Sequence, residues 1–388
     1  MSADADVLDR VRSRLLSAGL APTPTEVARA LREDGLLLGG DALLAEAERL
    51  QAELSGAGPL EPLLRMPGVT DVLVTAPDAV WVDRGAGVER VEVRFRDEAA
   101  VRRLAQRLAA SCGRRLDDAA PYVDGRLADG TRLHAVLAPV SVGGTCLSLR
   151  VPRRRSFSLG ELVTAGSMPA ELAPWLLAVI GARLAVVVSG GTGTGKTTWV
   201  SMLLAHCDLR DRIVIVEDSA ELVPDHPHVV RLESRPPNIE GAGAITLRDL
   251  VRQSLRMRPD RVVVGEVRGA EVVDMLAAFN TGHEGGLTTV HANSAADVPA
   301  RLEALALTGG LDRPAAHAQM AAGLDVVLHL ERGRDGVRRW SSVSVARRVG
   351  DVTVLHDALL RAADGGLERG EAFDCLVTRL GQHAPVIA

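Results

Sequence analysis

Residues Gly190–Thr198 read GGTGTGKTT, and this glycine-rich stretch decides the fold of the segment around it. An apolar run, LAVVV at 184–188, precedes the stretch, and a helical pattern that begins at Lys196 follows it. Glycines let backbone N–H groups turn inward around a phosphate, a lysine adds a compact positive charge, and a threonine hydroxyl can bind Mg²⁺. The helix directs the positive end of its dipole at the same anion. The stretch therefore predicts a phosphate-binding loop between a strand and a helix.

The residues expected to bind the phosphates occupy nine consecutive positions: Gly190, Gly191, Thr192, Gly193, Thr194, Gly195, Lys196, Thr197 and Thr198. Lys196 is the only lysine among the 45 basic residues of the chain, so every other positive side chain is an arginine. A planar guanidinium is broader than an ammonium and does not replace it at a tight site. This single exception indicates that the loop requires a slim cation.

Four apolar runs predict the strands of a parallel sheet, because helical segments alternate with them. These runs lie at 184–188, 213–216, 262–264 and 287–290. A hairpin is expected to follow them and to end near residue 345. We therefore predict an α/β domain over 161–349 and a helical tail over 350–388.

The region before this domain divides into three further segments. Residues 1–57 carry apolar side chains at three- and four-residue spacing, which predicts helices. Residues 58–150 mix strand-like pieces, among them the alternating VERVEVRF, with one helix that begins after Asp97, and this predicts a compact α+β domain. Residues 151–160 contain Pro, Ser and three arginines and are expected to form a linker.

Acidic residues follow two of the predicted strands, at the sheet edge where the phosphate loop also lies. Glu217 and Asp218 follow the second strand, and Gly265-Glu266 follows the third, where a P-loop enzyme usually carries aspartate. Carboxylates at this edge suit a metal ion and an attacking water. Either acid could instead cap a helix or lie in solvent, and the phosphate loop favours the catalytic interpretation.

His291 directly follows the fourth strand, so its side chain is expected at the same edge as the acids. His283 lies just before that strand, in a glycine-rich turn. An isolated histidine is more often structural than catalytic, but this placement raises the alternative that His291 senses a phosphate. Arginines can also meet the charge of a transferred phosphoryl group. Arg132 and Arg150 precede the linker and are candidates, although a solvated surface role is the simpler interpretation for each.

The composition excludes several classes of protein. The net charge of −5 and the aromatic content of 2% argue against a protein that coats or stacks on nucleic acid. Four scattered cysteines without a C-x-x-C pair fit neither a disulfide framework nor a zinc site. The acidic start, MSADADVLDR, does not resemble a secretory signal. We therefore expect a cytoplasmic protein.

Four motifs in order resemble the type II/type IV secretion ATPases, and most closely their Tad/CpaF-like pilus-assembly branch. The motifs are GGTGTGKTT, IVEDSAEL, RMRPDRVVVGEVRG and TGHEGGLTTVHANS, with PYVDGRLADGTRLHAVLAPVS upstream. The resemblance covers residues 58–350. It implies a RecA-like P-loop NTPase domain, ATP and Mg²⁺ as ligands, and a homo-hexamer that works with a polytopic platform protein at the cytoplasmic face of the inner membrane.

The resemblance also implies roles for individual residues. Glu217 resembles the acid that polarises the attacking water, Glu266 the acid that holds Mg²⁺ together with Thr197, and His291 the γ-phosphate contact. Arg132 and Arg150, with Arg126 as a third candidate, resemble arginines that reach the nucleotide from the N-terminal domain. Asp218, Arg268 and His283 are expected to support them. The four-cysteine zinc module of some relatives is missing from the sequence, so no structural zinc is expected.

Three functions remain open on these grounds. The first is an ATP-hydrolysing motor for pilus assembly or protein secretion. The second is a conjugation or DNA-transfer ATPase, which the charge and aromatic content disfavour. The third is a switch that binds ATP without hydrolysing it, which the two acids and His291 disfavour.

Overall fold

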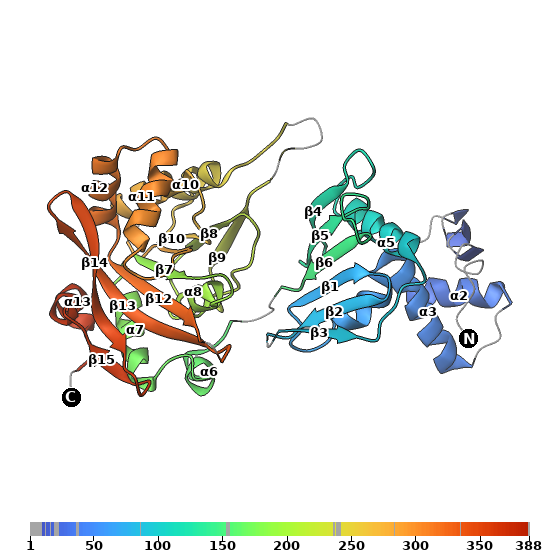
Figure 1. Ribbon diagram of the computed structural model, residues 1–388, viewed down its shortest axis with the longest axis horizontal. Coiled ribbons are helices and arrows are strands. Elements are labelled where there is room, and N and C mark those ends of the chain that lie inside the picture. Colours follow the sequence, from blue (N-terminus) through green and yellow to red (C-terminus); the bar gives the residue numbers. More distant parts are fainter. Residues whose placement is uncertain are drawn as a thin grey trace. The chain divides into compact units, whose positions relative to one another are not determined.

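The computed structural model divides the chain into two compact units, Met1–Pro152 and Arg153–Ala388 (Figure 1). It describes residues 10–386 apart from 12, 16, 19–22, 36–38, 86, 153–155, 236, 238–241, 283 and 334. Within that described part of the chain, no helix is both long enough and apolar enough to cross a bilayer. Each unit has its own sheet and its own apolar core.

The first unit begins with helices where the sequence predicts them. Helix α2 spans Pro24–Glu33 and begins after Thr23, whose hydroxyl caps the backbone N–H of Glu26. Helix α3 spans Gly40–Ser55. Leu31 and Leu50 are fully buried in a small core of this helical segment, separate from the core of the sheet that follows.

The α+β part of this unit is a six-stranded sheet in the order β3-β2-β1-β6-β5-β4, with helix α5 (Glu98–Ser111) packed on its apolar face. The short helices η1 (Gly58–Leu60) and α4 (Glu61–Leu64) precede it. Its strands are β1 Asp71–Ala76, β2 Ala79–Asp83, β3 Val88–Val91, β4 Tyr122–Arg126, β5 Arg132–Val136 and β6 Cys146–Arg150. The alternating segment 88–95 forms a strand only to Val91, because Val91 pairs with Val80 at the start of β2 and no strand lies beyond.

The second unit contains a nine-stranded sheet in the order β15-β14-β13-β12-β7-β11-β10-β8-β9. The strands from β12 to β9 are parallel, and those from β13 to β15 are antiparallel. The bounds are β7 Val186–Gly190, β8 Ile213–Glu217, β9 Val229–Glu233, β10 Arg261–Val264, β11 Leu287–Val290, β12 Val326–Arg332, β13 Arg338–Val349, β14 Val352–Arg361 and β15 Leu367–Arg369. The four predicted strands are thus β7, β8, β10 and β11, with β7 shifted by two residues.

Helices cover both faces of this sheet, as expected for a doubly covered parallel sheet. Helices α7 (Ala173–Gly181), α8 (Lys196–Leu204) and α13 (Phe373–Leu380) contribute to one core. Helices α9 (Leu247–Ser254), α10 (Glu271–Asn280), α11 (Val298–Thr308) and α12 (Arg313–Gly323) contribute to the other, and Figure 1 shows α10, α11 and α12 gathered together. Helix α6 (Leu159–Thr164) begins inside the predicted linker, because Ser158 and Glu161 form a capping box.

The prediction of a helical tail over 350–388 is wrong. Residues 352–361 form β14, which pairs with β13 along most of its length, and β15 adds one more strand at that edge. Among residues 350–386, α13 is the one α-helix, and its Phe373 and Leu376 reach the core. The apolar spacing of VTVLHDALL fits a helix or a strand, and pairing with the neighbouring β13 stabilises the strand.

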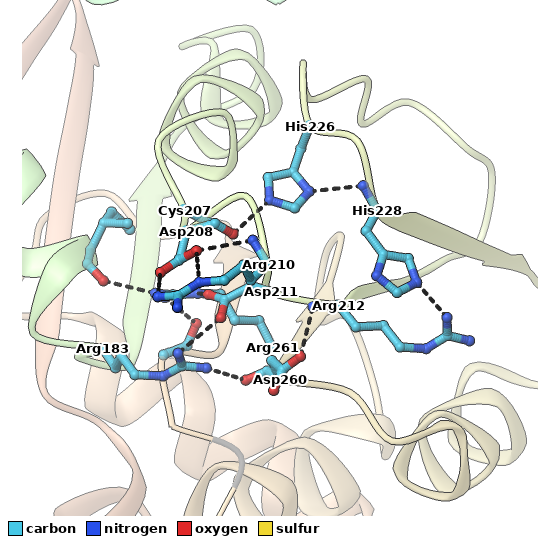
Figure 2. A network of polar contacts seen from close by, with 12 residues as sticks. Arg183, Cys207, Asp208, Arg210, Asp211, Arg212, His226, His228, Asp260 and Arg261 are labelled. Atoms are coloured by element: carbon cyan, nitrogen blue, oxygen red, sulfur yellow. Dashed lines mark hydrogen bonds and ion pairs between the residues drawn. The ribbon is translucent and has the colours of Figure 1, made fainter.

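A network of charged side chains fixes the opposite end of the parallel strands, where each strand begins (Figure 2). Arg261 at the start of β10 is 2% exposed and donates to Asp211 Oδ2 at 2.8 Å and to the Ile180 carbonyl at 2.8 Å. Arg183 donates to Asp211 Oδ1 at 3.0 Å. Because both oxygens of Asp211 accept from guanidinium groups, the buried charge is well compensated. The strand starts are therefore tied together, while their carboxyl ends carry the candidate site.

Candidate nucleotide site

The predicted phosphate loop connects β7 to α8, as the sequence indicates. Gly190 ends β7 with a φ of 151°, and a Cβ there would lie 2.4 Å from the Leu330 carbonyl oxygen. Gly195 caps α8 with a φ of 95°, a left-handed conformation that favours glycine. These two positions accept only glycine for backbone reasons, and the loop therefore delivers the N-terminus of α8 to the end of β7.

Lys196 is 7% exposed and lies inside this loop. Its Nζ donates to the carbonyl oxygens of Gly190 at 3.1 Å and Gly191 at 2.9 Å. Burial lowers the pKa of Lys196, and the carboxylate of Glu266 acts in the opposite direction. The ammonium is thus held by the loop's own backbone, in a space that a planar guanidinium would not fit.

Glu217 ends β8 and is 5% exposed. Its Oε1 accepts from the backbone N–H groups of Glu221 at 2.9 Å and Leu222 at 3.0 Å. Its Oε2 is buried and has no hydrogen-bond partner among the described residues. Burial raises the pKa of Glu217 to about 7, although the two backbone hydrogen bonds oppose the shift. A carboxyl with such a pKa can hold or accept a proton near neutral pH.

Sterics explain why Gly265 follows β10 in place of the usual aspartate. A Cβ at Gly265 would lie 2.6 Å from Cγ of Glu217 and 3.2 Å from its Oε1. The first of these distances is shorter than real Cβ contacts, which essentially never fall under 3.0 Å. Gly265 therefore leaves the space that the Glu217 side chain occupies.

Glu266 and His291 lie close together at the ends of β10 and β11, with His291 Nε2 at 2.8 Å from Glu266 Oε1. Lys196 Nζ lies 3.3 Å from His291 Nδ1 and 3.5 Å from Nε2, so the ammonium sits over the imidazole ring. Burial and the charge of Lys196 lower the pKa of His291. Burial would raise the pKa of Glu266, but it is lowered because Arg268 donates to Oε2 at 2.6 Å and adds its charge. Lys196, Glu266 and His291 are thus brought together, with an ionised carboxylate and a neutral imidazole.

The predicted supporting residues lie around this cluster or outside the described part. Arg268 contacts Glu266 directly. Asp218 is exposed, accepts from Ser234 Oγ at 3.1 Å, and acts electrostatically on Arg268. His283 lies outside the described residues. Of these three, Arg268 has the direct contact with a candidate catalytic group.

The three candidate arginines of the first unit, Arg126, Arg132 and Arg150, form one row. Arg126 pairs with Arg132 across β4 and β5, and Arg132 pairs with Arg150 across β5 and β6. Residues directly opposite one another share a face of a sheet. Leu133 and Leu149, which alternate with them, point into the core, so the arginines lie on the other face. The structure therefore brings together three candidates that the sequence leaves apart.

Several residues beside the phosphate loop are not singled out by the sequence. A cavity of about 430 Å³ beside the phosphate loop is lined by Gly191, Thr192, His291, Ala292, Asn293, Asp297 and Arg301. Asn293 and Arg301 follow His291 in the chain, and their proximity to that residue is the signal that could have found them. His329 also approaches the site from β12, through Ser189 at 2.8 Å, and nothing local in the sequence marks it.

Comparison with known proteins places these features in a family. Residues 53–344 match the model of the family described as "Type II/IV secretion system protein". A putative conjugal transfer protein of Mycobacterium tuberculosis is 57% identical over 330 residues, which cover 82% of this chain and 94% of that protein. The type IV secretion system protein PtlH of Bordetella pertussis is 33% identical over 61% of this chain and 76% of its own length.

Two solved structures share the fold. The ATPase DotB of Legionella pneumophila matches with a TM-score of 0.52 and 19% identity over 76% of this chain and 79% of that one. The pilus retraction motor PilT with bound ADP matches with a TM-score of 0.51 and 20% identity over 80% of this chain and 82% of that one. The second unit is thus a RecA-like domain preceded by an α+β domain. Together with the family match, this shows that the chain belongs to the type II/IV secretion system protein family.

Proposed function

We propose that this protein is an ATP-hydrolysing motor that powers pilus assembly or protein secretion. The observation that carries the proposal is the position of His291 beside a phosphate loop, with its ring 3.3 Å from Lys196 Nζ and 2.8 Å from Glu266 Oε1. A loop that wraps phosphates, a lysine and a carboxylate beside it are groups that enzymes use for phosphoryl transfer, and a neutral imidazole next to them can donate a hydrogen bond to a phosphate oxygen. Glu217, on the neighbouring strand β8, adds a carboxyl with a pKa near 7.

The residues at the loop fit ATP and Mg²⁺. Gly190 and Gly195, with φ of 151° and 95°, let the loop turn tightly into the N-terminus of α8, where backbone N–H groups can bind phosphate oxygens. Thr197 in the first turn of α8 and the ionised Glu266 offer the hydroxyl and carboxylate oxygens that Mg²⁺ prefers. Bound there, the ion would offset the negative charge of the phosphates. The loop residues 190–198 are accordingly assigned to nucleotide binding.

Each remaining group has a role that its surroundings support. Glu217 accepts a proton from the attacking water, because its pKa lies near the working pH and its Oε2 has no hydrogen-bond partner among the described residues. Glu266 stays ionised beside Arg268 and Lys196 and holds positive charge at the loop. His291 contacts the terminal phosphate, because its neutral ring lies against Lys196.

The arginine row of the first unit completes the proposal. Arg132 and Arg150, with Arg126 beside them, concentrate positive charge on one face of the six-stranded sheet. We infer that they meet the phosphates of a bound nucleotide, in the manner of arginine fingers. In this proposal the protein forms a homo-hexamer of the Tad/CpaF type and acts on a polytopic partner at the cytoplasmic face of the cell membrane.

The direct test is steady-state phosphate release from ATP by the full chain. Glu266→Gln keeps the size of the side chain and removes its charge, so turnover is expected to fall by at least about a hundredfold. Glu303→Gln, on α11 and hydrogen-bonded to His317, is the matched control and is expected to keep the parent's turnover. Tight ATP binding without turnover by the parent chain would contradict the motor and support a non-hydrolysing switch.

The relatives also raise a second candidate. The Mycobacterium tuberculosis protein is named for conjugal transfer, and so is TrbB of Rhizobium radiobacter, which is 33% identical over 57% of this chain and 67% of its own length. A role in DNA transfer would make turnover rise with added DNA, and the rise would fade steeply with salt. Turnover that is insensitive to DNA between low and physiological salt would favour the pilus or secretion motor.

A further inference from the structure

The cavity beside the phosphate loop extends the nucleotide site from His291 to helix α11. Its volume of about 430 Å³ lies in the range of pockets that hold small ligands, about 300–1,000 Å³. One wall is the loop itself, at Gly191 and Thr192, and another is the segment that runs from His291 to Arg301. Among the described residues, Lys196 contacts His291 but does not line the cavity. The cavity therefore opens on a side of His291 that the catalytic cluster does not occupy.

Helix α11 fixes Arg301 at the wall of this cavity. Val298, Leu302 and Leu305 bury one face of the helix in the apolar core. Arg301 borders that face and is exposed, and its N–H donates to the Asp297 carbonyl at 3.0 Å, as a helix requires. Among the residues that the structure describes, the Arg301 guanidinium forms neither a hydrogen bond nor an ion pair. It is thus available to an anion that enters the cavity.

Positive side chains outnumber negative ones around His291. Burial lowers the pKa of His291, and the charge of Lys196 lowers it further. The charges of Arg268 and Arg301 add to this effect, while the carboxylate of Glu266 opposes it. A neutral ring among three cations and one carboxylate lies in a positive potential, which favours an anion beside it.

The side chains that line the cavity suit a phosphate ion. The fork of an arginine can bind two phosphate oxygens through parallel N–H groups. The Asn293 amide and the neutral ring of His291 can each donate a further hydrogen bond. Asp297 is the acidic side chain at the wall. Its Oδ2 accepts from Ser294 Oγ at 2.8 Å, and the N-terminus of α11, which follows it directly, offsets its charge.

We propose that this cavity binds the inorganic phosphate that hydrolysis releases, and that Arg301 is its main contact. The inference rests on the proposed ATP hydrolysis. In that reaction the water oxygen bonds to the γ-phosphorus, a proton of the water passes to Glu217, and the bridging oxygen leaves with ADP. The free phosphate forms beside His291, which is the proposed contact of the terminal phosphate, and the cavity begins at that ring. Arg301 therefore acts on the product, after the bond has broken.

The direct test measures the binding of inorganic phosphate to the full chain with ADP bound, by equilibrium dialysis with radiolabelled phosphate. Arg301→Ala is expected to weaken phosphate binding at least about fivefold, because it removes a charge-assisted contact. Arg301→Lys keeps the charge but loses the fork, so its affinity should lie between those of the parent and Arg301→Ala. Arg313→Ala is the matched control, because Arg313 lies on α12, pairs with Glu303 and does not line the cavity. It should bind phosphate as the parent does.

Two further measurements distinguish the released phosphate from the terminal phosphate of ATP. The phosphate concentration that halves ATP turnover should rise at least about fivefold in Arg301→Ala and stay unchanged in Arg313→Ala. The dissociation constants of Arg301→Ala for ADP and for the non-hydrolysable analogue AMP-PNP should stay within about twofold of the parent's. If AMP-PNP affinity fell as much as phosphate affinity, Arg301 would hold the terminal phosphate of ATP, and the inference would be overturned.

The outcomes separate this inference from the proposed function. If the parent hydrolyses ATP and Arg301→Ala binds phosphate as tightly as Arg313→Ala, the phosphate site is refuted and the motor stands. If the parent does not hydrolyse ATP, the motor fails, and the dialysis still decides whether the cavity binds phosphate. A parent chain that binds ADP but no phosphate beside it would overturn the inference directly.

Discussion

Replacing Glu217 by glutamine is expected to make the protein more stable and, at the same time, inactive. The carboxyl is 5% exposed, and burial raises its pKa from the ordinary value of 4.5 to about 7. The folded protein therefore keeps a proton between these pH values that the unfolded chain has already lost. By linkage, this group lowers the free energy of unfolding as pH rises from 4.5 to 7, and the loss is complete above pH 7.

The size of the effect follows from the shift. A change from 4.5 to about 7 corresponds to a loss of about 3 kcal/mol in the free energy of unfolding above pH 7. Glutamine carries no charge, and its amide oxygen can still accept from the N–H groups of Glu221 and Leu222. Glu217→Gln should thus match the parent near pH 4.5 and exceed its stability by up to about 3 kcal/mol at pH 8.

Urea unfolding in the absence of nucleotide measures this difference. Tryptophan fluorescence reports mainly on the second unit, because three of the four tryptophans, Trp175, Trp199 and Trp340, are buried there and only Trp81 lies in the first. Glu266→Gln is the control and should lower the free energy of unfolding at neutral pH. The pKa of Glu266 is lowered by Arg268, so its charge stabilises the folded state there. If Glu217→Gln gained no stability between pH 5 and pH 8, the carboxyl would not be the buried, proton-holding group described here. The parent's ATP turnover should rise with pH through about 7, and the variant should show no such rise.

Four further predictions concern other parts of the molecule. Lys196→Arg should abolish most ATP turnover and nucleotide binding in a fluorescent-ADP titration, because the space around Nζ is closed by carbonyls at 2.9 and 3.1 Å. Gly265→Ala should lower turnover and the thermal midpoint together, since its Cβ would lie 2.6 Å from a neighbouring carboxylate side chain. Arg132→Ala and Arg150→Ala should lower kcat by at least about tenfold with little change in ADP affinity, and equal turnover would remove them from the site. Asp211→Ala should cost about 3–5 kcal/mol in urea unfolding, because it leaves a buried guanidinium unpaired, and kcat per folded molecule should stay unchanged.

The sequence predicts which edge of the sheet carries the site, because each candidate residue lies next to its own strand in the chain. Each of β8, β10 and β11 is a short apolar run followed within two residues by a polar candidate, and the carboxyl ends of parallel strands meet at one edge. Glu217, Glu266 and His291 could therefore be chosen without knowing the order of the strands. The phosphate loop adds the fourth position, since its pattern fixes both the strand and the helix around it.

Features that depend on long-range pairing could not be predicted in this way. Nothing in the segment VVLHLER distinguishes His329 from other strand residues. Its contact with Ser189 joins residues 140 positions apart in the chain. The arginine row depends on the register of three antiparallel strands, and 44 arginines offer too many candidates to single out three. The apolar spacing of the tail at 350–388 fits a helix as well as a strand, and only the pairing with β13 distinguishes the two.

The glycine at position 265, where an aspartate is usual, and the raised pKa of Glu217 have the same structural cause. A side chain at position 265 would occupy the space where Cγ of Glu217 lies, so glycine there is what allows the carboxyl to enter the interior. Once inside, that carboxyl is desolvated and its pKa rises to about 7, while Glu266, one residue beyond the glycine, is kept ionised by Arg268. Two carboxyls whose pKa values are driven apart by their surroundings are suited to different tasks. In the proposed function Glu217 accepts the proton and Glu266 holds positive charge. Gly265→Ala should disturb the first task before the second, lowering the pH at which turnover rises.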